Sequence, residues 1–177
     1  NRDNNLSYCE SIASTNPCAE QPLPPYGCCC LGSIDLTRFV REPFEEKTHF
    51  DFAGFAELCR TAVRMLDNVL DATAWPLPEQ QQEAQNKRRI GLGFTGLGDA
   101  LVMLNLRYDS EPARAMARQI SEQLRDTAYD ASVDLAIERG WQFAAPAQES
   151  GKHVLVVGAG PSGMSAAYHL RRRGHRV

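Results

Sequence analysis

An asparagine, a cysteine and a glutamate are spaced two residues apart near the start of the chain, in the stretch TNPCAEQ at residues 15–21. In extended backbone, side chains two residues apart point to the same side. Asn16, Cys18 and Glu20 would then place an amide, a thiol and a carboxyl group around one small volume. This trio suits a reaction in which sulfur takes an atom from a substrate, the carboxylate moves a proton and the amide holds a hydroxyl group. The alternative is an ordinary polar loop, because Asn-Pro commonly begins a turn.

A run of three cysteines follows ten residues later, at Cys28, Cys29 and Cys30. Six cysteines in a reducing compartment are more often free, catalytic or metal-bound than joined in structural disulfides. Adjacent cysteines do not easily reach one tetrahedral ion together, and neither a C-x-x-C pair nor a histidine accompanies them, so we expect no metal site here. Cys59 is expected in the core because it lies on an apolar helix stripe, and Cys9 carries no chemistry that its neighbours indicate.

Composition limits the setting in which these groups act. The chain has 177 residues, of which 43% are hydrophobic, enough for one domain or two small ones. The formal net charge is −3 and the basic residues are scattered, so we expect no nucleic-acid partner and favour a small substrate. No apolar run reaches the length of a membrane span, and the polar N-terminal residues lack the pattern of a signal peptide. We therefore expect a cytoplasmic protein without a membrane partner.

The elements that must position these groups are visible in the spacing of apolar residues and prolines. Four prolines at residues 17–25 exclude a regular helix, so the cysteine motif is expected on loop or extended backbone, and residues 31–40 as a short strand or turn. A helix capped by Asp51 is predicted over residues 51–72. Its apolar stripe consists of Phe52, Phe55, Cys59, Val63, Leu66, Val69 and Leu70.

A second long helix is predicted to begin after Ser110 and to end near Gly140. Its stripe consists of Met116, Ile120, Leu124, Ala128, Ala131 and Leu135. The Gln-rich stretch after Pro78 has no apolar period, so it is either an exposed connector or a polar helix face.

Two glycine patterns have different contexts. The stretch GLGFTG at residues 91–96 matches G-x-G-x-x-G but follows NKRRI rather than a hydrophobic strand, so we interpret it as a glycine-rich turn and not as a nucleotide site. Gly158, Gly160 and Gly163 instead follow VLVV and precede SAAYHL. These glycines allow a tight turn and close approach of the backbone to a pyrophosphate, which predicts the start of a unit that binds FAD or NAD(P).

The stretch NPCAEQPLPPYG followed by CLGSIDL closely resembles the active-site segment of the ribonucleotide reductase large chain. The segments NRDNNLSYCE and RRIGLGFTGLGDAL continue the resemblance, which covers about residues 1–135. It looks most like the adenosylcobalamin-dependent class II enzymes. The resemblance implies reduction of ribonucleotides to deoxyribonucleotides for DNA replication, with adenosylcobalamin as cofactor. It also implies a ribonucleotide substrate and a thiol reductant such as thioredoxin or glutaredoxin as partners.

Site roles follow from the same resemblance, residue by residue. Cys18 matches the cysteine that becomes a thiyl radical and takes the substrate 3'-hydrogen, Glu20 matches the base on the 3'-hydroxyl, and Asn16 matches a substrate-holding residue. The family pattern C-x-L-G-S-I-N-L aligns Cys29 with one member of the redox pair that supplies two electrons. The departures from this pattern are Cys28, Cys30 and Asp35.

The C-terminal segment resembles another family. From near Val133 to the end it resembles FAD/NAD(P)-binding oxidoreductases, particularly the small subunit of glutamate synthase. The acidic ribose ligand expected about 20 residues past the glycines has no place before Val177. We hypothesise that two families meet within residues 132–140, in a chimeric or truncated product.

We therefore expect a helix-rich α/β fold in three parts. These are a partial reductase barrel over residues 1–136, a junction over 137–150 and a truncated Rossmann-like β-α unit over 151–177. Three functions stay open: a reductase fragment that does not turn over alone, an FAD/NAD(P)-dependent oxidoreductase fragment, and a non-catalytic chimeric product with exposed thiols.

Overall fold

The computed structural model describes residues 4, 7, 10–19, 21–140 and 151–152. The chain divides into two compact units, one comprising residues 1–25 and 140–177 and the other residues 26–139. Each unit is described by itself. The predicted dinucleotide-binding glycines, Gly158, Gly160 and Gly163, lie outside the described residues.

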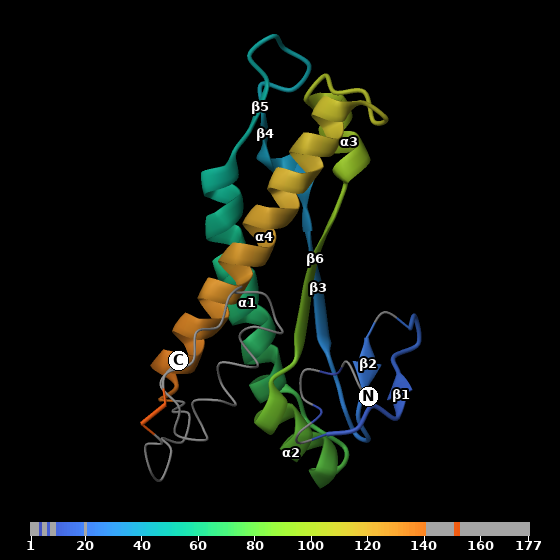
Figure 1. The fold of residues 1–177 in the computed structure, drawn as a ribbon, viewed down its shortest axis with the longest axis vertical. Helices are drawn as coiled ribbons and strands as arrows, with labels where there is room; N and C mark the ends of the chain where they lie inside the picture. Colours follow the sequence, from blue (N-terminus) through green and yellow to red (C-terminus); the bar gives the residue numbers. More distant parts are fainter. Residues whose placement is uncertain (1–3, 5–6, 8–9, 20, 141–150, 153–177) are drawn as a thin grey trace. The chain divides into compact units, whose positions relative to one another are not determined.

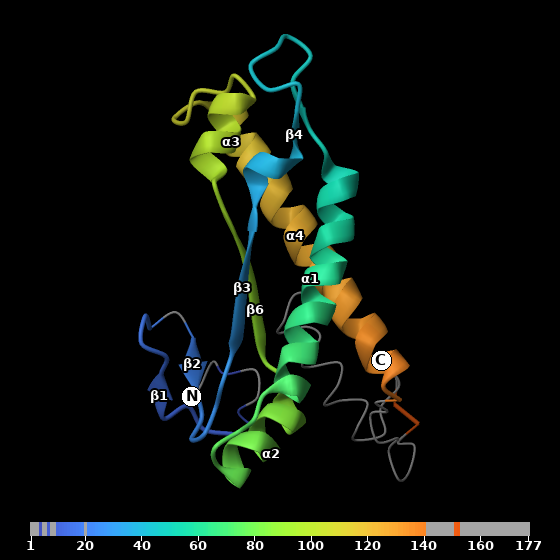
Figure 2. The same cartoon turned by 180° about the vertical axis from the view of Figure 1, so that it is seen from behind.

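Two parallel strands form the centre of the unit comprising residues 26–139. β3 (Cys30–Asp35) pairs with β6 (Ile90–Thr95), from Cys30 opposite Ile90 to Asp35 opposite Thr95. Parallel neighbours need a long crossover connection, and here it contains α1 (Phe52–Ala72), which packs against both strands (Figures 1 and 2). The mixed α/β class is confirmed; the described residues contain no closed barrel.

The segment predicted as a short strand or turn contains both. β3 ends at Asp35, whose carboxylate accepts hydrogen bonds from the backbone N–H and hydroxyl of Thr37 and caps the short 3-10 helix η1 (Leu36–Phe39). A small antiparallel pair follows, formed by β4 (Val40–Arg41) and β5 (His49–Phe50). This pair leads the chain back toward the start of α1.

The helix predicted over residues 51–72 is confirmed as α1. Asp51 is its N-cap, and the Asp51 Oδ1 atom accepts a hydrogen bond of 2.8 Å from the Gly54 N–H. Most of the predicted stripe is buried, and Val69 is its exposed member. Phe55, at the centre of the stripe, meets the rings of Phe39 and Phe50 at centroid distances of 5.3 and 5.5 Å. This aromatic group is part of the core cluster that also includes Val40 of β4.

The second predicted helix is α4 (Glu111–Glu138), and Ser110 caps it as expected. Its buried residues include four of the predicted stripe, namely Ile120, Leu124, Ala131 and Leu135. α4 packs beside α1, and the far half of its stripe contacts Ile90 and Leu92 of β6. α3 (Leu97–Met103) connects β6 to this helix.

The Gln-rich stretch forms α2 (Pro78–Lys87), so the polar-helix interpretation of this segment is confirmed. The interpretation of GLGFTG as a turn is wrong, because Gly91 and Gly93 lie inside β6. A Cβ atom added at Gly91 would lie 2.5 Å from Leu31 Cδ2 of the paired strand, so a larger residue there would have to displace the Leu31 side chain. Only Gly96, with φ of 72°, makes the turn into α3.

Both α1 and α4 cover the same face of the β3–β6 pair. Ile34 of β3 points to this face and is 4% exposed, and a Cβ at Gly32 would contact Leu66 of α1 at 3.2 Å. The alternate residues of β3 are exposed, with Leu31 at 55%. The pair therefore has a helix-covered face and an open face.

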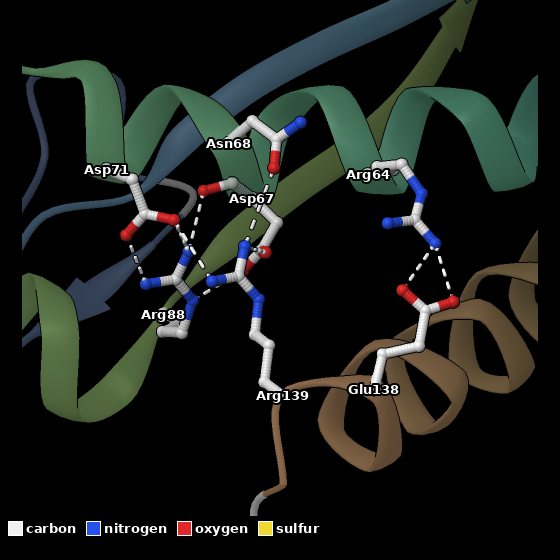
Figure 3. A network of polar contacts seen from close by, with 7 residues as sticks. All are labelled: Arg64, Asp67, Asn68, Asp71, Arg88, Glu138 and Arg139. Atoms are coloured by element: carbon white, nitrogen blue, oxygen red, sulfur yellow. Dashed lines mark hydrogen bonds and ion pairs between the residues drawn. The ribbon is translucent and has the colours of Figure 1, made fainter.

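A cluster of charged side chains joins α1, the α2–β6 turn and the end of α4 (Figure 3). Arg88, whose backbone is left-handed with φ of 45°, donates from Nε to Asp67 Oδ1 at 2.6 Å and from Nη1 to Asp71 Oδ1 at 2.7 Å. Arg139 at the end of α4 pairs with the same two carboxylates, and Arg64 holds Glu138 through two bonds of 2.8 Å. The hydrogen bonds from Arg88 hold the pKa of Asp71 below its ordinary value. These contacts fix the point at which β6 begins.

We predict that Asp67→Ala destabilises the protein by about 3 kcal/mol, because it removes the poorly solvated carboxylate that Arg88 and Arg139 share and leaves both of them with the carboxylate of Asp71 alone. The Arg88 and Asp67 side chains are 8% and 10% exposed. Urea unfolding followed by circular dichroism measures the change. The matched control is Arg60→Ala, which breaks the exposed Arg60–Asp134 ion pair between the same two helices and should cost less than about 1 kcal/mol. Equal losses in the two variants would contradict the structural role of the cluster.

Candidate functional site

The NPC motif lies on the loop of a short hairpin. β1 (Ser14–Thr15) pairs antiparallel with β2 (Pro22–Leu23), and residues 16–21 connect them. Pro17 and Pro22, at either end of the loop, prevent helix formation in the connection, as the sequence predicts. The hairpin thus presents Cys18 near its tip.

Asn16, the first residue of this loop, closes it through hydrogen bonds to Gln21, the last. Its backbone N–H donates to the Gln21 carbonyl oxygen at 3.2 Å, and its side-chain Oδ1 accepts from the Gln21 N–H at 3.0 Å. The Asn16 carbonyl oxygen also accepts from the Ala19 N–H at 3.0 Å, and Ala19 adopts a left-handed φ of 62°. Of the two predicted forms, loop and extended backbone, the loop is confirmed: Pro17, Cys18 and Ala19 form a turn, because Asn16 accepts its hydrogen bonds.

Cys18 is exposed and forms no disulfide. A reacting thiol must be accessible, and the exposure of Cys18 meets this requirement. Glu20 lies outside the described residues, so a shared pocket for Asn16, Cys18 and Glu20 stays a prediction.

Cys29 lies just before β3, on the open face of the strand pair. A Cβ atom added at Gly91 would be 3.5 Å from Cys29 Sγ and would also meet Leu31, so Cys29 and Leu31 share the side away from α1. The Cys30 N–H donates to the Arg89 carbonyl oxygen at 3.2 Å, which begins the pairing at this point. The chain thus holds the half-buried Cys29 beside Gly91, on the side of the strand pair away from α1.

The remaining described thiols lie in different surroundings. Burial raises the pKa of Cys59 to about 11, and this residue is sealed in the core as predicted. Cys28 and Cys30 are half-buried, and burial is the main cause that raises the pKa of each. Cys9 lies outside the described residues.

Cys18 and Cys29 belong to different units. Each therefore has a defined place only within its own unit. Within the described ranges, no group of three or more His, Cys, Asp or Glu residues is arranged to hold a metal ion. None of the helices in the described part has both the length and the apolar composition of a membrane span.

Sequence reasoning missed two residues that shape the site. Gly91 leaves room beside Cys29. Its strand begins only at Ile90, and the charged residues NKRR before it gave no hydrophobic pattern from which a strand could be predicted. Arg89 contributes its carbonyl oxygen to the first bond of the parallel pair, and no side-chain pattern could have indicated this backbone role.

Two family patterns match this chain. The pattern of the ribonucleotide reductase barrel domain matches residues 1–157, and that of an NAD(P)-binding Rossmann-like domain matches residues 156–177. The vitamin B12-dependent ribonucleoside-diphosphate reductase of Mycobacterium tuberculosis (strain ATCC 25618 / H37Rv) is 40% identical over 140 residues, which are 79% of this chain and 19% of the relative.

Two further relatives extend this finding. The vitamin B12-dependent ribonucleoside-diphosphate reductase of Thermoplasma acidophilum is 39% identical over 140 residues, covering 79% of this chain and 18% of the relative. The large subunit of the ribonucleoside-diphosphate reductase of African swine fever virus (strain Badajoz 1971 Vero-adapted) is 30% identical over 162 residues, covering 88% and 20%. This chain thus spans about a fifth of the length of the curated relatives that it matches.

The reductase pattern covers most of the chain, including the hairpin that carries Cys18 and the strand that follows Cys29. The chain belongs to the ribonucleotide reductase family, through that family's barrel domain.

Proposed function

We propose that this chain carries the reacting thiols of a ribonucleotide reductase, which replaces the 2'-hydroxyl of a ribonucleotide by hydrogen. The observation that carries the proposal is the exposed Cys18 near the tip of a hairpin loop closed by Asn16. A radical thiol must meet the sugar directly, and an exposed sulfur on a loop held in one shape meets that requirement.

The proposed reaction begins and ends at Cys18. Its sulfur, as a thiyl radical, takes the 3'-hydrogen atom, while Glu20 takes the proton of the 3'-hydroxyl. The 2'-hydroxyl then leaves as water, and Cys29 with a second thiol supplies two electrons and two protons and becomes a disulfide. Cys18 finally returns its hydrogen atom to the 3'-carbon, so the balance is ribonucleotide and dithiol to deoxyribonucleotide, disulfide and water.

Asn16 has a positioning role in this proposal, in addition to the substrate-holding role that the family resemblance implies. Its Oδ1 atom accepts the Gln21 N–H bond, so the Asn16 side chain is tied to the loop that carries Cys18. The same side chain that contacts substrate would then also hold the turn that carries Cys18.

The open face of the strand pair gives Cys29 room to reach a sugar. Gly91 and Gly93 alternate with the core residues of β6, and a Cβ atom added at Gly93 would meet nothing within 4 Å. In barrels of parallel strands with helices outside, the helix-free side of each strand faces the interior. We propose that the substrate lies against this face.

Adenosylcobalamin is the cofactor that we propose, since two of the relatives are named vitamin B12-dependent. When bound it supplies the unpaired electron that the reaction needs on sulfur. The exposed thiol of Cys18 fits such a group, because a cofactor must approach the sulfur closely. A dithiol protein of the thioredoxin or glutaredoxin kind would reduce the disulfide afterwards, and a reducing compartment such as the cytoplasm suits this exchange.

Residues 156–177 support a second candidate, because they match an NAD(P)-binding Rossmann-like domain. We propose that Gly158, Gly160 and Gly163 derive from a dinucleotide-binding turn of the FAD/NAD(P)-dependent oxidoreductases, joined to the reductase segment. Flavin retained through purification, seen by its visible absorbance, would favour this function over the reductase.

We predict that residues 10–139, placed in the matching segment of the Mycobacterium tuberculosis relative, support deoxyribonucleotide formation. In this hybrid, Cys18→Ser should abolish both product formation and exchange of the substrate 3'-hydrogen with solvent, since no sulfur remains to carry the radical. Cys29→Ser should retain 3'-hydrogen exchange but block repeated turnover, since only the electron supply is lost. Labelled substrate and chromatography of the products measure both quantities.

The matched control is Cys59→Ala, a core thiol remote from the chemistry, which should retain 3'-hydrogen exchange. If Cys29→Ser abolished exchange and Cys18→Ser left it intact, the two roles would have to be reversed. If both variants kept full turnover, the reductase proposal for these thiols would be wrong.

A further inference from the structure

Leu31 is an apolar side chain beside one of the proposed reacting thiols. It belongs to β3 and lies on the open face of the strand pair, where it is 55% exposed. The other exposed residues of this strand, Ser33 and Asp35, are polar. Single exposed leucines are common on protein surfaces, so exposure alone assigns Leu31 no role. Its contacts are what distinguish it.

Gly91 leaves the room in which Leu31 lies across the neighbouring strand. The register pairs these two residues, and a Cβ atom built at Gly91 would be 2.5 Å from Leu31 Cδ2 and 4.0 Å from its Cγ atom. The leucine therefore occupies space that the first side-chain atom of any other residue at position 91 would need. Such a residue would have to push the leucine aside.

The same point above Gly91 is close to the Cys29 sulfur. A Cβ atom built there would be 3.5 Å from Cys29 Sγ. The leucine methyl group and the sulfur thus border one small region, on the side of the strand pair away from α1. Leu31 is an apolar neighbour of the thiol on the face where we propose that the substrate lies.

Beyond Leu31 the open face is nearly bare backbone. The register pairs Ser33 with Gly93, and a Cβ atom built at Gly93 would meet none of the described atoms within 4 Å. Side chains two residues apart in a strand share a face, so Leu31 lies between this bare stretch and Cys29. A molecule that lies on the bare stretch and reaches the sulfur therefore passes over the leucine.

A ribose ring has two kinds of surface that such a side chain distinguishes. The ring carbons carry hydrogens and form an apolar face, whereas the hydroxyl groups need hydrogen-bonding partners. The leucine side chain offers no hydrogen bond, so it favours contact with the carbon face. The contact matters for rate, because a misplacement of about 1 Å can slow a reaction by about 100-fold.

We propose that Leu31 is a substrate contact, whose side chain packs against the carbon face of the ribose and holds the sugar at the Cys29 sulfur. This inference rests on the proposed reductase function. It adds to that function a residue that acts by contact alone, with no bond made or broken at the leucine. Gly91 supports it by leaving the leucine room over β6.

Alkylation of the reduced 177-residue chain tests the placement of Leu31 without any turnover. The rate of reaction with iodoacetamide is followed at Cys29 by peptide mass spectrometry, with Cys18 as the internal reference. Leu31→Ala should raise the rate at Cys29 several-fold relative to Cys18, because it uncovers the sulfur. Leu31→Met should leave the rate unchanged, since methionine conserves the volume.

The matched control for this labelling is Val102→Ala, which shortens an apolar side chain that is 60% exposed on α3. It should not alter the rate at Cys29. An unchanged rate at Cys29 in Leu31→Ala would overturn the inference, whatever the reaction of the enzyme.

The contact with the sugar is tested in the hybrid that carries residues 10–139 in the Mycobacterium tuberculosis relative. Leu31→Ala should lower deoxyribonucleotide formation per 3'-hydrogen exchanged by about 100-fold, because the sugar is misplaced at Cys29 while the thiol of Cys18 is unaltered. Leu31→Met should restore most of this ratio. An equal ratio in Leu31→Ala and Val102→Ala would overturn the inference alone, whereas exchange that survives Cys18→Ser would overturn the proposed function itself.

Discussion

Parallel pairing of β3 with β6 decides which side each residue around the cysteine run faces. Because strand side chains alternate, the pairing places Ile34 in the core and leaves Leu31 exposed on the other face. The same alternation separates Cys29 from Cys30. A slip of one residue would exchange the faces and place Cys29 against the helices.

The register depends in turn on contacts made by residues with no chemical role. The Arg89 carbonyl oxygen accepts a hydrogen bond from the Cys30 N–H. The side chain of the preceding residue, Arg88, is bound to Asp67 and Asp71 of α1. Arg139 ties the end of α4 to the same carboxylates. The charged cluster of Figure 3 therefore links the packing of both long helices to the place where the reactive strand begins.

Sequence reasoning predicted the long helices well because their signals are local. Asp51 and Ser110 are caps followed by apolar residues at helical spacing, and both helices begin where expected.

The hairpin around Cys18 was only partly predictable: prolines excluded a helix, but the bonds that make Asn16 close a turn depend on its partner at Gln21. Pairing between β3 and β6 joins residues about 60 apart in sequence, and no local pattern reports such a partner. The glycine pattern of β6 therefore predicted a turn, because the sequence alone does not show that β3 is its strand partner.

The central structural claim is that Cys29 faces Gly91 on the open side of the strand pair while Cys30, the first residue of β3, faces the helices. Disulfide trapping measures it directly, by introducing Gly91→Cys, oxidising under mild conditions and identifying the linked peptides by mass spectrometry. The account predicts a link from the new cysteine to Cys29. A link to Cys30 instead would contradict the register, and with it the role proposed for Cys29.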